Sequence, residues 1–175
     1  MGPWVSMEAK PFTLPGQHKY HGQPFPLALE LKTKSLKAGC QWITKNATLL
    51  GQQAAGHGAV IIRGLPLTSP QDFDAAVSSF NFPPFSYEDS LSNAYRINYT
   101  PLVFSANEAP PEVTIFLHHE MAQTPIYPSK LFFFCQIAPD EGGATPICRS
   151  DILWERLTKK LPDFASACLE KGLKY

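Results

Sequence analysis

Apolar residues recur at helical spacing near the start of the chain. Ile43, Leu50 and Ala54 follow one another at steps of seven and four, which places them on one face of a helix over residues 36–55. Glycines at positions 56 and 58 supply the conformational freedom with which helices commonly end. This stretch is the first helix that the sequence predicts.

Boundary residues predict three more helices: one beginning at Ser69-Pro70, one over residues 151–161, and one from Pro162 to Gly172. Ser150 is expected to cap the second of these, because a serine hydroxyl can accept a hydrogen bond from a free amide of the first turn. The same helix is expected to direct Ile152, Leu153 and Leu157 inward.

Short apolar and β-branched runs predict strands, and most lie between the helices: residues 59–62, 94–99, 102–105, 113–117, 131–137 and 145–148. The first 30 residues are rich in proline and polar groups, so an extended, wrapped segment is expected there. Helices followed by strands and then helices again are typical of an α+β chain with an antiparallel sheet.

Composition narrows the class of protein. The 175 residues are enough for one domain with a sizeable core. Fifteen basic residues balance fifteen acidic ones without a basic stripe, which argues against nucleic-acid binding. No apolar run is long enough for a membrane span, and the N-terminus has no secretory signal pattern. Four cysteines are widely spaced, so a cytoplasmic protein with reduced thiols is expected.

The candidate chemistry lies in the sequence His118-His119-Glu120. Side chains alternate in a strand, so His118 and Glu120 would share one face and His119 would point to the other. One imidazole and one carboxylate are two of the three ligands in a 2-His-1-carboxylate site for Fe(II). A hydrolytic zinc site on His118 and His119 is disfavoured, because adjacent strand residues face opposite ways and no further ligand pattern is present.

The surrounding residues make the pattern specific. The segments 116–122 (FLHHEMA), 128–133 (PSKLFF) and 142–146 (GGATP) resemble the TauD/TfdA (taurine dioxygenase) superfamily. Within it, the chain is most similar to the clavaminate synthase-like branch, which uses glutamate as the carboxylate ligand. Residues 57–64 (HGAVIIRG) resemble the strand that opens this fold, so the resemblance runs from about residue 55 to the C-terminus.

The resemblance implies a fold and an activity. The fold would be the front part of a double-stranded β-helix (jelly roll) with flanking helices, formed by residues 31–175 after an extended segment at 1–30. His118 and Glu120 would bind Fe(II), and the Thr145 hydroxyl would help to hold the distal carboxylate of the cosubstrate 2-oxoglutarate. The reaction would oxidise a small-molecule substrate as 2-oxoglutarate is decarboxylated.

The chain also departs from the family pattern. No histidine follows Glu120, so the second histidine ligand of the family has no counterpart here. The family's arginine for 2-oxoglutarate is missing too, since Arg149 and Arg156 follow Thr145 too closely. We therefore expect this chain not to turn over 2-oxoglutarate by itself. The alternative is a non-catalytic, truncated remnant that acts as a binding or interaction module.

Overall fold

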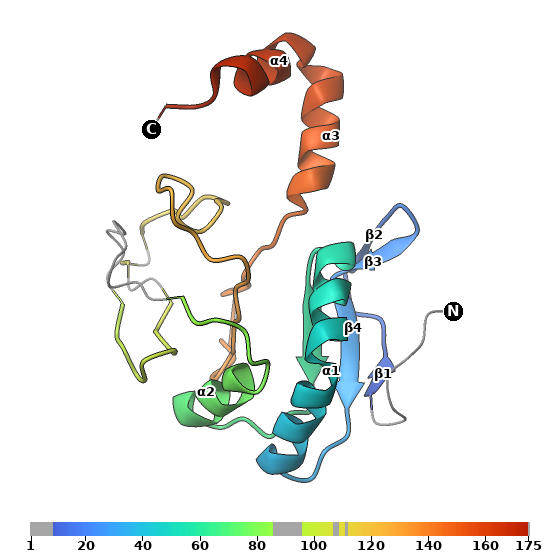
Figure 1. Ribbon diagram of the computed structural model, residues 1–175, viewed down its shortest axis with the longest axis vertical. Coiled ribbons are helices and arrows are strands. Elements are labelled where there is room, and N and C mark those ends of the chain that lie inside the picture. The colour runs from blue at the N-terminus through green and yellow to red at the C-terminus, as the bar shows by residue number, and fades with distance from the viewer. Residues whose placement is uncertain (1–8, 86–95, 107–108, 111, 175) are drawn as a thin grey trace.

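The computed structural model describes residues 9–85, 96–106, 109–110 and 112–174. Figure 1 shows a layer of helix and strands formed by the first third of the chain, a long irregular middle part, and a pair of helices at the C-terminal end. In the described part of the chain there are four helices and two small sheets. No helix in that part is both long enough and apolar enough to cross a membrane.

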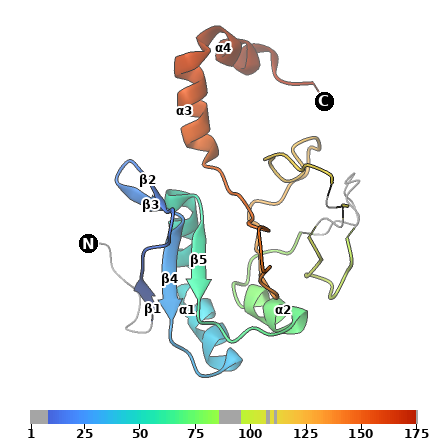
Figure 2. The same cartoon turned by 180° about the vertical axis from the view of Figure 1, so that it is seen from behind.

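The main sheet has the order β1-β4-β5, formed by Ala9–Pro11, Leu27–Leu31 and Val60–Arg63. β1 and β4 are antiparallel, whereas β4 and β5 are parallel. Helix α1, Leu36–His57, forms the crossover between these two parallel strands (Figure 2). The expectation of a wholly antiparallel sheet was therefore wrong, because α1 carries the chain back to the end of the sheet at which β4 began, and β5 then runs in the same direction.

The core lies between α1 and this sheet. Its buried cluster is formed by Leu27, Leu29, Leu31, Trp42, Ile43, Leu50 and Ala76. α1 begins at Ser35, whose hydroxyl accepts a hydrogen bond from the Ala38 amide at 3.2 Å. It ends at Gly58, which has a left-handed φ of 83°. The predicted first helix and the strand after it are thus confirmed, with ends within two residues of those expected.

A hairpin of β2 (His18–Tyr20) and β3 (Gln23–Phe25) lies at the C-terminal end of α1. His57, the last residue of α1, donates from Nδ1 to the Pro24 carbonyl at 2.8 Å, because a carbonyl oxygen can only accept. The first 30 residues are extended, as predicted, but they are organised into strands that the sequence analysis did not identify.

The helix α2, Pro70–Ser78, begins where it was predicted. Ser69 and Asp72 form a reciprocal capping box, in which each side chain accepts a hydrogen bond from the other residue's backbone amide. Thr44 of α1 donates to the Ser79 carbonyl at 3.1 Å, which joins the two helices.

Residues 131–137 were expected to form a strand, and this prediction was wrong: no ladder includes them in the described part of the chain. From residue 131 to residue 135 the side chains nevertheless alternate between exposed and partly buried, as in a strand. Phe132 packs against Phe80, which follows α2, with tilted rings whose centroids are 4.9 Å apart, and Phe134 packs in the same way against Phe73 of α2 at 5.4 Å. Phe133 points the other way and is 72% exposed. These two phenylalanines have thus packed against α2 and the residues that follow it, whereas a strand also requires a hydrogen-bonded neighbour.

The other strands predicted after β5 also differ from the structure. Residues 113–117 and 145–148 are irregular. Between 94–99 and 102–105 the described residues form one isolated bridge, from Asn98 to Phe104, and residues 94 and 95 lie outside the described part. The described residues therefore do not form a double-stranded β-helix. The fold prediction holds only at the coarser level of helices combined with small sheets.

The C-terminal helices α3 (Ser150–Lys160) and α4 (Pro162–Lys171) were both predicted. Ser150 does not cap α3, because Arg149 occupies the cap position and the serine is already the first helical residue. Ile152 is buried as expected, but Leu153 is exposed, because α3 extends away from the sheet layer (Figure 1).

Candidate metal centre

The segment that carries the candidate ligands ends in a tight turn. The Ala122 amide donates to the His119 carbonyl at 3.3 Å, so the chain reverses directly after Glu120. Met121 lies at the third position of this turn with a φ of 57°, a conformation that is uncommon for a residue with a side chain. Its side chain is buried, which anchors the turn and fixes the backbone from which Glu120 projects.

His118 is held in one tautomer by its own backbone. Its Nδ1 lies 2.7 Å from the Phe116 carbonyl oxygen. Because that oxygen can only accept, Nδ1 must carry the proton, and the lone pair of the neutral ring is then on Nε2. An Nδ1–H bonded to a carbonyl is the arrangement that orients histidine ligands in metal sites. His118 is therefore prepared to bind a metal through Nε2.

Glu120 lies beside this nitrogen. Its Oε2 is 3.9 Å from His118 Nε2, and its Oε1 is 3.1 Å from a guanidinium nitrogen of Arg96. The Glu120 side chain is 15% exposed, whereas that of His118 is 59% exposed. The carboxylate is thus the more fixed member of the pair, and the imidazole has room to move toward it.

His119 is directed elsewhere. Its Nε2 shares a hydrogen bond of 2.6 Å with the hydroxyl of Ser150, at the first residue of α3. The structure therefore brings His118 and Glu120 together and separates His119 from them, although the segment is not the strand that was predicted. A zinc site that combines His118 and His119 is not supported by this arrangement.

The pair suits a divalent metal in donor type and approximately in spacing. Metal–donor distances of about 2.1 Å, typical of Zn²⁺ and Mg²⁺ sites, place two ligands at right angles roughly 3.0 Å apart. The observed 3.9 Å must therefore shorten by roughly 1 Å, which a rotation of the exposed His118 ring can supply. Within residues 9–85, 96–106, 109–110 and 112–174, no group of three His, Cys, Asp or Glu could hold a metal.

Thr145, the predicted residue for 2-oxoglutarate, is exposed in the irregular segment before α3. The glycine pair that precedes it has positive φ values of 66° and 64° at Gly142 and Gly143. A Cβ at Gly143 would lie 2.6 Å from Pro139 Cγ, so the backbone bend requires glycine there. No hydrogen bond joins the Thr145 side chain to another residue that the structure describes. Its role at the metal centre stays a prediction.

Arg96 is the site residue that sequence reasoning missed. It lies 24 residues before Glu120, in a part of the chain with no clear periodicity. The backbone after it is fixed by a short bridge between Asn98 and Phe104, and Ser105 donates from its amide to the Ile97 carbonyl at 2.8 Å. Only the folded chain brings its guanidinium to Glu120, so no local pattern could have indicated it.

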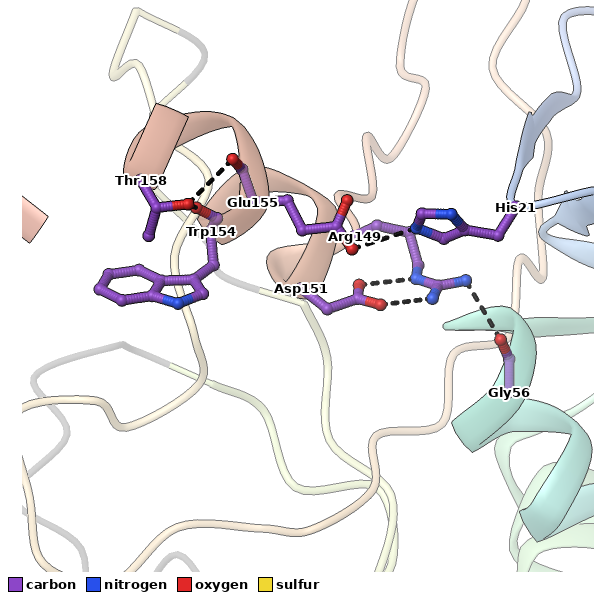
Figure 3. A network of polar contacts seen from close by, with 7 residues as sticks. All are labelled: His21, Gly56, Arg149, Asp151, Trp154, Glu155 and Thr158. Atoms are coloured by element: carbon purple, nitrogen blue, oxygen red, sulfur yellow. Dashed lines mark hydrogen bonds and ion pairs between the residues drawn. The ribbon is translucent and has the colours of Figure 1, made fainter. Parts of the chain in front are cut away.

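A second polar network joins α3 to the first third of the chain (Figure 3). The guanidinium of Arg149 donates to both carboxylate oxygens of Asp151, at 2.7 and 2.5 Å, and to the Gly56 carbonyl at 3.2 Å. These hydrogen bonds lower the pKa of Asp151 to about 2. Nearby, His21 donates to Glu155 at 3.1 Å. Arg149 therefore ties the start of α3 to the end of α1.

Comparison with known proteins places this chain in a family. The family model described as taurine catabolism dioxygenase TauD, TfdA family matches residues 22–174. The chain belongs to the TauD/TfdA family. The resemblance seen in the sequence motifs is thereby confirmed, and a mixed structure with small sheets and four helices is compatible with a fold of this type.

A curated relative supports the same assignment. The chain is 38% identical over 169 residues to a clavaminate synthase-like protein of Arabidopsis thaliana. The match covers 93% of this chain and 51% of the relative. This TauD/TfdA family member therefore spans about half the length of the relative that it matches.

Proposed function

We propose that His118 and Glu120 bind Fe(II), and that this chain provides part of an Fe(II)/2-oxoglutarate-dependent dioxygenase acting on a small molecule. The observation that carries the proposal is the approach of His118 Nε2 to Glu120 Oε2, at 3.9 Å, with Nδ1 engaged by a backbone carbonyl. Family membership supports it, because TauD/TfdA proteins generally use Fe(II) and 2-oxoglutarate.

Each residue has a separate task in this proposal. His118 and Glu120 hold the metal in a fixed orientation and leave part of its coordination sphere open for the cosubstrate. Thr145 donates a hydrogen bond to the distal carboxylate of 2-oxoglutarate. The bound iron and its cosubstrate supply the oxidising chemistry, and the protein supplies binding and orientation.

Metal binding by the protein is the direct test. Anaerobic titration with Fe(II), or with Mn(II) as a redox-stable probe, is expected to show one site. His118→Ala and Glu120→Ala should each weaken binding at least about tenfold, since even residues behind the ligands typically contribute that much. His119→Ala is the matched control, because it removes a neighbouring imidazole that faces Ser150. Equal affinities for the wild type and the two ligand variants would refute the proposal.

The cosubstrate role of Thr145 has its own test. With Mn(II) present, Thr145→Val should weaken 2-oxoglutarate binding, because the variant keeps the shape of the side chain and loses the hydroxyl. Thr145→Ser, which keeps the hydroxyl, should retain most of the affinity. If valine and serine variants bind 2-oxoglutarate equally well, Thr145 does not contact the cosubstrate.

A second candidate function is a non-catalytic binding or interaction module. Large exposed apolar side chains favour it, among them Phe116, Phe133 and Ile137. Exposed apolar surface of this kind commonly marks a place where another protein surface packs. Metal titration separates the two functions, since an interaction module has no reason to lose metal affinity in the His118 and Glu120 variants.

A further inference from the structure

The two oxygens of the Glu120 carboxylate have different neighbours. Oε1 accepts a hydrogen bond from Arg96 at 3.1 Å, and Oε2 faces His118 Nε2 at 3.9 Å. Arg96 and Glu120 are both largely covered, with side-chain exposures of 21% and 15%. A partly buried contact between a guanidinium and a carboxylate is charge-assisted and holds its partners in one orientation.

We propose that Arg96 is the positioning residue for the metal ligand Glu120, an inference that rests on the proposed metal site. By holding Oε1, the guanidinium orients the carboxylate so that Oε2 is the oxygen that faces His118 Nε2 and would bind the metal. Glu120 then occupies one coordination position and not two. This matters because a two-histidine, one-carboxylate site leaves three positions open only when its carboxylate binds through a single oxygen.

The fold provides the rigidity that this task requires. Ile97, the residue after Arg96, donates from its amide to the Ser105 hydroxyl at 2.9 Å and accepts from the Ser105 amide at 2.8 Å. These two bonds fix the backbone next to Arg96. On the other side, the turn at Met121 fixes the backbone next to Glu120. The contact therefore joins two constrained segments.

Charge and positioning predict opposite effects of removing Arg96. A guanidinium beside the ligand repels a metal cation, so loss of its charge alone would tighten metal binding. Loss of its hydrogen bond frees the carboxylate to rotate away from the metal, which weakens the site. Residues that orient ligands typically contribute about 10–100-fold in metal affinity. The direction of the change in affinity thus decides between the two.

The experiment is a Co(II) titration of the whole chain, followed by the visible spectrum of the bound ion. Arg96→Ala is expected to weaken Co(II) binding about 10–100-fold and to change the spectrum. Arg96→Lys keeps the charge but loses the planar donor geometry, so it should also bind more weakly than the wild type. Arg156→Ala is the control. It removes an arginine of α3 whose guanidinium lies over the ring of Tyr20 and not beside Glu120.

The outcomes separate this inference from the proposed function. Affinity equal to or above the wild type in Arg96→Ala, with an unchanged spectrum, would overturn the positioning role and leave the metal site intact. If wild type binds Co(II) no better than His118→Ala, the metal site itself is refuted and the inference fails with it. Urea unfolding of each variant checks the fold. If Arg96→Ala does not fold, Arg96→Gln takes its place, because glutamine keeps an amide donor and loses the charge. A Co(II) affinity of Arg96→Gln between those of the wild type and Arg96→Lys supports the positioning role. A Co(II) affinity above that of the wild type overturns it.

Discussion

Two glycines in the first third of the chain should respond in opposite ways to the same substitution. Gly64 follows β5 with a φ of 89°, and a Cβ there would lie 2.1 Å from the backbone oxygen of Leu31. Gly51 lies inside α1, where a Cβ would make ordinary contacts of 3.5 Å with Phe82 and 3.9 Å with Lys130. An added methyl group would therefore collide with the main chain at Gly64, whereas at Gly51 it would make ordinary contacts with side chains.

The magnitudes follow from these surroundings. At Gly64, alanine adds the left-handed backbone penalty of roughly 1–2 kcal/mol and an overpacking cost of roughly 1–3 kcal/mol. Gly64→Ala should therefore lower the free energy of unfolding by about 2–5 kcal/mol. At Gly51, alanine reduces the backbone entropy lost on helix formation, so Gly51→Ala should raise the free energy of unfolding by about 0.5–1 kcal/mol.

Urea unfolding followed by far-ultraviolet circular dichroism measures both changes, with the wild type at the same low concentration. The reasoning is refuted if Gly64→Ala stays within about 0.5 kcal/mol of the wild type, the usual range for an inconsequential surface change. It is also refuted if Gly51→Ala destabilises the protein, because the space beside that residue would then be smaller than the structure shows.

Three further predictions concern association, turnover and pH. The exposed face that includes Phe133 should make the chain associate in solution, and Phe133→Lys should reduce this; a monodisperse wild-type monomer in light scattering would contradict it. The chain with Fe(II), ascorbate and 2-oxoglutarate should form no more succinate than Glu120→Ala, whereas clear iron-dependent succinate would show that the site is more complete. The hydrogen-bonded ion pair with Arg149 holds the pKa of Asp151 at about 2, against an ordinary 3.8. The stabilisation of the folded protein by this pair is therefore complete above about pH 4 and is lost as the pH falls through 2. A titration midpoint of the Asp151 carboxyl near 3.8 by nuclear magnetic resonance would refute this.

The parts of the fold that the sequence predicted correctly are those with local signals. The helix α1 has its periodicity and Gly58, and α2 has the Ser69-Pro70 start. The strand β4 was missed because Leu27–Leu31 is almost wholly buried and shows no alternation of polar and apolar residues. Its parallel pairing with β5 depends on the crossover by α1, which a local pattern does not report.

The opposite error occurred at residues 131–137, whose composition is that of a strand. Composition reports that side chains suit a half-buried surface, and Phe132 and Phe134 do pack, on Phe80 and Phe73. It does not report which segment will pair with the backbone. The contacts of the candidate site also differ in how far a local pattern could predict them. The proximity of His118 and Glu120 followed from a spacing of two residues, whereas the contact of Arg96 with Glu120 depends on tertiary structure.

The two adjacent histidines also give the protein a means of optical readout. His118 faces Glu120, while His119 is bonded to Ser150 at the start of α3. The two contacts share one backbone, because His118 and His119 are joined by a peptide bond. Trp154 lies one turn further along α3 and is partly exposed, so its fluorescence is sensitive to small changes in the helix surroundings. A change in tryptophan emission on addition of metal, lost in Trp154→Phe, would show that the candidate centre and α3 are coupled; the variant separates the signal of Trp154 from those of Trp4 and Trp42.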